Sequence, residues 1–170
     1  GTIDLSNASD SVTHSLVSGV MRGIPAFSHW ERCRTRFGIL PNGVTIALEK
    51  YAPMGSALCF PVECIIFSLI VQLASKHCHV NHYFRVYGDD IVVHRDIFDE
   101  TIRLLEELHF EVNLDKTFEP GSQFTESCGI ECYQGQDVSP VRIPRFYDPL
   151  YYTESSKRTS PGRVMGVMTL

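Results

Sequence analysis

The 170-residue sequence has no excess of positive charge and no long uninterrupted hydrophobic run. Its 15 Lys and Arg against 20 Asp and Glu give a formal net charge of −5, which excludes a chain that coats nucleic acid by uniform electrostatic attraction. The most apolar stretch, 60–74, is interrupted by Pro61 and Glu63 and falls short of the roughly 20 residues that a spanning helix needs. We therefore expect no membrane segment.

A signal peptide, an internal repeat and an initiator methionine are also missing. Six cysteines without a secretory signal are typical of free thiols in a reducing compartment rather than of a disulfide scaffold. The residues Gly1 to Asp4 resemble a strand already under way, which indicates a piece excised from a longer protein. The composition, 44% hydrophobic and 21% charged, excludes a disordered tail and predicts one folded core.

The hydrophobic periodicity and the turn residues predict helices packed on an antiparallel sheet, an α+β fold. The first predicted elements are a helix capped by Ser9 or Asp10, which carries Val12, Leu16, Val17 and Val20 and ends before Gly23, and a hairpin around the turn at 41–43. They are followed by a helix from Met54 to about Lys76, apolar all round and hence buried, and by a hairpin at 84–93. The last predicted elements are a helix after Asp96, which buries Ile97, Thr101, Leu104, Leu105 and Leu108, and short strands from 110 to 140.

The segment 84–93 is the most informative. Two β-rich runs are joined by Gly88 and Asp89, a two-residue turn of the kind that needs positive φ. The pattern predicts a tight hairpin with Asp89 and Asp90 at its tip. An isolated Gly-Asp-Asp is commonly a solvated turn, but two well-formed strands favour a rigid platform for a ligand.

Asp89 and Asp90, together with Asp4 at the end of the first strand, are the candidate metal ligands. Adjacent carboxylates repel each other, and folding gains nothing from this placement unless a cation neutralises them. Mg²⁺ favours one or two protein carboxylates plus substrate phosphates, and two ions about 3.5–4 Å apart can clamp both oxygens of a phosphoryl transfer. We therefore predict a site for two Mg²⁺ ions, which Mn²⁺ could replace.

Five ordered segments resemble the motifs of one family, the RNA-directed RNA polymerases of positive-strand RNA bacteriophages, or leviviral replicases, within the palm-domain polymerases. The segments are Thr2–Asp10 for motif A, Pro53–Ser56 with Phe60–Glu63 for motif B, Val86–Asp90 for motif C, and Asn113–Phe118 with Gly121 and Phe124–Gly129 for motifs D and E. One such motif is weak evidence, whereas five in order with sensible spacing are strong.

The resemblance implies catalytic roles for four residues. Asp4 and Asp89 would bind the two Mg²⁺ ions, with Asp90 beside them as a weaker contact. The substrate 3′-hydroxyl would attack the α-phosphate of a nucleoside triphosphate and release pyrophosphate, which Lys116 would neutralise or protonate. On residue type alone, Lys116 is an ordinary exposed lysine after a turn.

The resemblance also implies three substrate-binding residues. Asp10 would accept a hydrogen bond from the ribose 2′-hydroxyl, which distinguishes RNA precursors from DNA precursors; its structural alternative is a helix N-cap. Gly55 and Ser56 would let the backbone approach template and nucleotide closely, and their alternative is a loop glycine with a serine cap. The best-known coliphage enzymes are associated with an asparagine at the position of Ser56. The resemblance therefore leaves open whether the Ser56 side chain contacts the ribose directly.

The expected organisation is a palm catalytic core at 1–140 and the start of a thumb or C-terminal extension, in part disordered, at 141–170. Five of the basic residues and only two acidic ones fall in 141–170. The excess of acidic residues therefore lies in 1–140, the region that contains the predicted catalytic residues. The expected partners are RNA template and product, nucleoside triphosphates, the missing fingers and thumb regions, and host proteins, in the cytoplasm of an infected bacterial host. Without basic fingers and a thumb, the segment alone should bind metal and RNA weakly and not turn over.

Three alternatives stay open: a non-catalytic RNA- or nucleotide-binding palm-like module, a reverse-transcriptase-like polymerase, and a cation-binding structural domain. The joint presence of the three aspartates and Lys116 argues against the first. Leu5 and Ser6 follow Asp4 without the bulky ring typical of reverse transcriptases, which favours RNA synthesis. The basic C-terminal stretch with its nearby tyrosines disfavours the third.

A histidine-rich stretch, with His77, Cys78, His79 and His82, suggests zinc at first sight. Its spacing matches no common zinc site, which favours a polar loop ahead of a strand.

Overall fold

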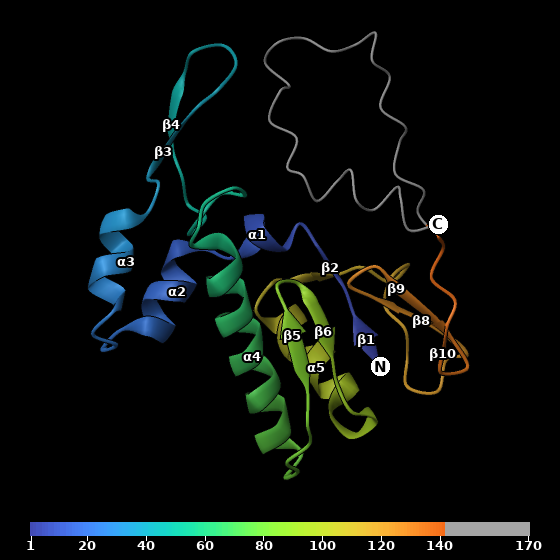
Figure 1. Cartoon of the computed structure of the whole chain (residues 1–170). Coiled ribbons are helices and arrows are strands. Elements are labelled where there is room, and N and C mark those ends of the chain that lie inside the picture. The colour runs from blue at the N-terminus through green and yellow to red at the C-terminus, as the bar shows by residue number, and fades with distance from the viewer. Residues whose placement is uncertain (142–170) are drawn as a thin grey trace, which may run out of the picture. The chain divides into compact units, whose positions relative to one another are not determined.

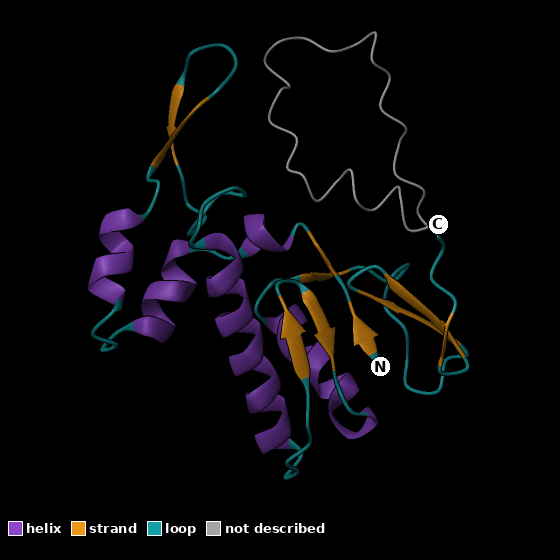
Figure 2. Cartoon of the chain, viewed as in Figure 1, coloured by secondary structure: helices purple, strands orange, loops and turns teal. Residues whose placement is uncertain are grey.

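A three-stranded antiparallel sheet and two long helices form the centre of the fold in the computed structural model, which describes residues 1–141 (Figure 1). The described elements are β1 (Thr2–Ile3), β2 (Leu5–Ser6), α1 (Ala8–Ser11), α2 (His14–Met21), α3 (Phe27–Cys33), β3 (Phe37–Ile39), β4 (Thr45–Ala47), α4 (Cys59–His77), β5 (Arg85–Tyr87), β6 (Asp90–Val92), α5 (Arg95–Glu107), β7 (Glu111–Val112), β8 (Phe124–Ser127), β9 (Ile130–Tyr133) and β10 (Gln136–Asp137). The α+β prediction is confirmed (Figure 2).

Four small antiparallel sheets organise these strands. The central sheet has the order β1-β6-β5, a second has the order β10-β9-β8, and β2 pairs with β7 and β3 with β4. The residues Gly1–Ser139 form one compact unit. The prediction for 141–170 lies outside the described residues, apart from Val141.

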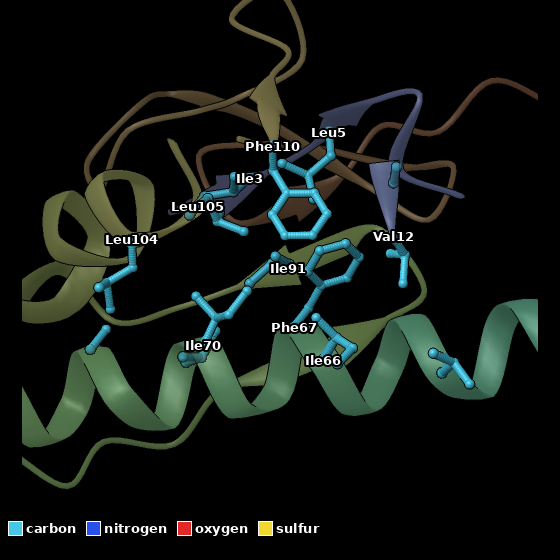
Figure 3. Close-up of a cluster of buried hydrophobic side chains, with 14 of the residues drawn as sticks. Ile3, Leu5, Val12, Ile66, Phe67, Ile70, Ile91, Leu104, Leu105 and Phe110 are labelled. Atoms are coloured by element: carbon cyan, nitrogen blue, oxygen red, sulfur yellow. The ribbon is translucent and has the colours of Figure 1, made fainter. Parts of the chain in front are cut away.

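The core lies where α4 meets α5 and the central sheet (Figure 3). Phe67 of α4 and Phe110 pack edge to face with ring centroids 5.1 Å apart, and Ile3 and Ile91 close the same cluster from paired strands. Each of these large apolar side chains is almost fully buried, and burial of one such side chain stabilises the fold by about 1.5–3 kcal/mol. This packing fixes the central strands against the two helices.

Helix α4 differs from its prediction in three ways. It begins at Cys59 rather than Met54, and it is apolar but not buried all round, since Leu69 and Leu73 are exposed on its outer face. Its apolar span is also longer than the sequence indicated, because by length and composition the helix is long and apolar enough to cross a membrane. In this fold half of that span is buried, so the helix serves as core.

The first predicted helix is divided into α1 and α2. Residues 12 and 13 take extended backbone because they pair with a distant segment: the N–H of His14 donates to Glu49 O at 2.8 Å, and that of Tyr51 donates to Val12 O at 2.8 Å. Thr13 caps α2 by accepting from the N–H of Leu16 at 3.2 Å. The predicted cap at Ser9 or Asp10 is therefore wrong, and Val20, expected on the buried face, is 41% exposed.

Other predictions hold with changed boundaries. The hairpin around 41–43 is confirmed, with Ile39 paired to Thr45, although helix α3 before it was not predicted. Helix α5 is confirmed and buries Ile97 and Leu105, but Leu108 lies beyond its end and is 40% exposed. All six cysteines, which fall within the described part of the chain, are free thiols as predicted.

Candidate functional site

The pairing of β1 with β6 sets the geometry of the candidate site. The register places Ile3 opposite Ile91, and both side chains point into the core. Because side chains alternate along a strand, the next residues outward, Asp4 and Asp90, lie opposite each other on the other face. Two aspartates that are 86 positions apart thus become neighbours.

The hairpin of β5 and β6 carries the third aspartate in its turn. Tyr87 pairs with Asp90, so Gly88 and Asp89 form a two-residue connection in which Gly88 takes φ +64°. A side chain at Gly88 would also meet the Phe60 ring, 3.0 Å from where a Cβ would stand. Glycine is therefore required here by both backbone and space.

A turn that follows β7 holds Asp4. The side-chain amide of Asn113 donates to Asp4 Oδ2 at 2.9 Å, and the backbone N–H of Asn113 donates to Asp4 O at 3.0 Å. The backbone N–H of Asp4 donates in turn to Thr117 Oγ1 at 3.2 Å. Asp4 is therefore fixed at its side chain and at both backbone groups.

Asp4 interacts electrostatically with three other residues that were predicted to be catalytic. Burial raises the pKa of the Asp4 carboxyl, whereas Lys116 and the hydrogen bond from Asn113 oppose that rise. The negative charges of Asp89 and Asp90 raise this pKa further. The structure therefore brings Asp4, Asp89, Asp90 and Lys116 within electrostatic range, and added positive charge would relieve the crowding of carboxylates.

Asp90 is engaged differently from Asp89. Its Oδ2 accepts from the backbone N–H of Cys128 at 3.1 Å, and its Oδ1 accepts from Ser127 Oγ at 3.4 Å. Cys128 takes φ +54° in the tight turn between β8 and β9, which orients its N–H toward the carboxylate. Asp90 thus joins the central sheet to the β8–β9 turn.

Asp89 lines a cleft of about 690 Å³ at the N-terminal end of α4. The same cleft is lined by the predicted substrate-binding residues Asp10, Gly55 and Ser56, so it gathers these three with Asp89. Asp4, Asp90 and Lys116 are not among its lining residues.

The three substrate-binding candidates are placed in distinct ways. Asp10 lies inside α1 and forms an ion pair with Lys50. Gly55 takes φ +92° with open space around it, and Ser56 Oγ accepts from the N–H of Leu58 at 3.3 Å. The serine therefore acts locally as a turn cap, as in its structural alternative.

Glu63 ends the segment that resembles motif B but was given no role from the sequence, and it is 8% exposed and lines the same cleft. Burial and the charge of Asp89 raise the pKa of Glu63, and the Cys59 thiol donates to its Oε1 at 3.8 Å. The next residue, Cys64, accepts from the N–H of Gly88 at 3.1 Å, so the start of α4 supports the hairpin turn. A lone acidic residue in an apolar helix was the signal available.

Lys50 and Asn113 were also given no role by sequence reasoning. Lys50 contacts Asp10 across 40 positions, and Asn113 contacts Asp4 across 109. No local sequence pattern indicates that Lys50 or Asn113 makes this contact, although Asn113 begins one of the segments that resemble the family motifs.

The match to known families agrees with this arrangement of motifs. Residues 1–151 match the family model described as "RNA replicase, beta-chain". This chain belongs to the RNA replicase beta-chain family. The resemblance predicted from the five motifs is thereby confirmed.

Curated relatives of this chain come from RNA phages. The RNA-directed RNA polymerase beta chain of Escherichia phage MS2 is 37% identical over 150 residues, which are 88% of this chain and 27% of the relative. That of Enterobacteria phage fr is 36% identical over 144 residues, covering 85% and 26%. The RNA-directed RNA polymerase subunit beta of Qbeta virus (strain MX1) is 35% identical over 144 residues, covering 84% and 24%. The chain thus spans about a quarter of the length of these curated relatives.

Proposed function

We propose that this chain carries the catalytic palm core of a viral RNA-directed RNA polymerase. The observation that carries the proposal is the convergence of Asp4, Asp89 and Asp90 at one end of the β1-β6-β5 sheet, in a chain of the replicase family. The reaction would join a ribonucleotide to the 3′ end of a growing RNA under the direction of a template during genome replication.

The donor set suits Mg²⁺. All three candidate ligands are carboxylates, the oxygen donors that this ion prefers, and burial, together with the smaller effect of the charges of Asp89 and Asp90, raises the pKa of Asp4. Asp4 and Asp89 would hold two Mg²⁺ ions, or Mn²⁺ in their place, and the ions would offset the negative charge of the reacting phosphates. Asp90, whose two oxygens already accept from the β8–β9 turn, would contribute a weaker contact.

The other residues would position the substrate and its charge. Asn113 favours the ionised form of Asp4 through its hydrogen bond, and Lys116, within electrostatic range of that carboxylate, would neutralise the departing pyrophosphate. The β8–β9 turn, whose hydrogen bonds hold the Asp90 carboxylate, would help to position the hairpin that carries Asp89 and Asp90. These assignments extend the roles implied by the motifs.

The cleft beside Asp89 would take the incoming ribonucleotide. Its volume of about 690 Å³ lies within the roughly 300–1,000 Å³ typical of small-molecule sites. Asp10 would accept the ribose 2′-hydroxyl while Lys50 holds its carboxylate in place, and the backbone at Gly55 and Ser56 would lie against the nucleotide. This arrangement would select RNA precursors.

The wider setting follows from the same proposal. The partners would be RNA template and product, nucleoside triphosphates, fingers and thumb regions, and host proteins, in the cytoplasm of an infected bacterium. A non-catalytic nucleotide-binding module is the alternative, and it would keep the cleft without metal-dependent synthesis.

The test is primer extension by a full-length replicase chain that contains these residues, with and without Mg²⁺. Asp4→Asn should abolish incorporation while RNA binding and thermal unfolding stay unchanged. The matched control is Asp99→Asn on the exposed face of α5, which should extend normally. Normal synthesis by the Asp4 variant would remove the proposal, and RNA binding without any wild-type synthesis would favour the module.

A further inference from the structure

We infer that His82, His94 and Asp96 form a binding site for a transition-metal ion such as Zn²⁺, separate from the carboxylate site. The three residues each offer one ligand atom, and these atoms all lie within 4.8 Å of one another. His82 Nε2 lies 2.7 Å from Asp96 Oδ2, and His94 Nδ1 lies 3.3 Å from the same oxygen. To bind one ion at metal–ligand distances of about 2.0–2.2 Å, the two rings would have to turn from their stacked arrangement so that one nitrogen lone pair of each, which lies in the ring plane, points at the ion.

The cluster lies at the open end of the β5–β6 hairpin. The register pairs Arg85 with Val92, so the chain enters this hairpin just after His82 and leaves it just before His94. The turn that carries Asp89 is at the opposite end. An ion here would tie the loop that follows α4 to the first turn of α5 and so close the hairpin at its base.

The donor types distinguish this site from the one proposed for Mg²⁺. Two imidazole nitrogens and one carboxylate oxygen suit Zn²⁺, Co²⁺ or Ni²⁺, whereas Mg²⁺ prefers oxygen ligands. Three protein ligands leave a fourth position for water. The side chains of His82, His94 and Asp96 are 31%, 46% and 45% exposed, so an ion can reach them from solvent.

The two histidine rings are stacked against each other. Their centroids are 3.9 Å apart and their planes differ by 27°. Two imidazoles stacked beside one carboxylate would repel if both were protonated, whereas metal binding uses the neutral rings. Neutral rings beside an ionised carboxylate therefore provide one negative charge, the correct sign for a divalent cation.

Asp96 supplies the negative charge that the proposed ion site needs. Asp96 belongs to the first turn of α5, where the helix dipole contributes partial positive charge that opposes a cation. His94 Nδ1 also accepts a long 3.4 Å hydrogen bond from the N–H of Asp96, which the ion would replace. Without the Asp96 carboxylate, two neutral imidazoles would face the positive end of a helix.

The neighbouring histidine supplies a control. His77 belongs to the same histidine-rich stretch, but its Nδ1 lies 2.6 Å from Glu100 Oε1, farther along α5. The fold therefore separates the histidines that are close in sequence. His77 contacts Glu100, whereas His82 lies beside His94 and Asp96, which follow the β5–β6 hairpin.

The experiment titrates Co²⁺ and Zn²⁺ into the tag-free full chain with its thiols alkylated, since free cysteines also bind these ions. With excess Mg²⁺ present throughout to fill the carboxylate site, visible Co²⁺ absorption with nitrogen and oxygen ligation should saturate at one equivalent, and Zn²⁺ should displace the Co²⁺. His82→Ala and Asp96→Asn should each weaken binding at least tenfold, whereas His77→Ala should leave it unchanged. Circular dichroism of each variant establishes that the fold is intact.

Other outcomes overturn the inference. If the His82 and Asp96 variants bind Co²⁺ as tightly as the wild type, or if His77→Ala weakens binding equally, the ion is held elsewhere. If the wild type shows no saturable binding, the three residues are a hydrogen-bonded cluster only. None of these readouts depends on RNA synthesis, so their failure is distinct from failure of the proposed function.

Discussion

Two hairpins of similar length in this chain have opposite surroundings. The β5–β6 hairpin lies against α4, and Ile91 in its second strand is fully buried. The β3–β4 hairpin projects from the body of the fold, with Phe37 and Ile39 64% and 78% exposed (Figure 1). Both connections contain a glycine with positive φ, although β5 and β6 are joined by residues 88–89 and β3 and β4 by residues 40–44.

The difference shows what makes a hairpin a platform for chemistry. The Asp89 turn is supported from below by Phe60 and Cys64, and its carboxylates are positioned by pairing with β1. Within residues 1–141, the hydrogen bonds that hold the β3–β4 turn come from its own residues, including Asn42 Oδ1, which accepts from the N–H of Val44 at 3.0 Å. Rigid placement comes from the packing and not from the turn.

The largest expected effect separates the two turns by function. In a full-length replicase chain, Asp89→Asn should lower ribonucleotide incorporation roughly 100- to 1,000-fold because it removes a charge aimed at the reacting centre. Asn42→Asp, the reverse change on the other hairpin, should leave the rate unchanged. Primer extension under saturating Mg²⁺ measures both, and equal effects at the two turns would contradict the comparison.

A second prediction compares the two hairpins by stability. Ile91→Ala removes a fully buried side chain and should lower the free energy of unfolding by about 2–5 kcal/mol. Ile46→Ala, at a position 38% exposed in β4, should cost less than about 1 kcal/mol. Urea denaturation of each variant gives these values. A larger loss for Ile46 would mean that the outer hairpin is buried in solution.

The third prediction concerns the hydrogen bond that holds Asp4. Asn113→Ala removes a donor that favours the ionised carboxylate, so the pKa of Asp4 should rise further. The acid limb of the pH–rate profile should move to higher pH, with a loss of about tenfold near its midpoint. Asn42→Ala makes the same chemical change away from the site, and its profile should match that of the wild type.

The smallest expected effect is on pH-dependent stability at the start of α4. The pKa of Glu63 is raised in the fold by burial and by Asp89, so its favourable contribution is present below about pH 4.5 and is lost as pH rises through the folded pKa. Glu63→Gln should therefore raise the urea midpoint at pH 7 and have little effect at pH 4. The opposite pH dependence would show that Glu63 has a cationic partner.

The local features of the site could be predicted from the sequence. Gly88 and Asp89 between two β-rich runs define a turn whatever the rest of the chain does, and the resemblance of Thr2–Asp10 to motif A implies that Asp4 belongs beside them. The α+β class followed from periodicity in the same way.

The remaining features depend on contacts between distant segments. Thr13 interrupts the predicted first helix because it pairs with Lys50, and propensity alone contains no information about that partner. Likewise, Asn113 and Ser127 become important only when the fold carries them to Asp4 and Asp90. The zinc hypothesis considered His82 with its sequence neighbours, whereas the fold places it with His94 and Asp96.

The position of β1 between later segments has a consequence for biosynthesis. Thr2 exchanges backbone hydrogen bonds with Phe118 at 3.0 and 2.9 Å, and its other neighbour, Val92, is also far along the chain. A nascent polypeptide therefore emerges with β1 unpaired, can pair it with β6 only after residue 92 has been made, and completes its other edge only after residue 118. The surroundings of Asp4, at the end of this strand, are therefore completed only late in synthesis.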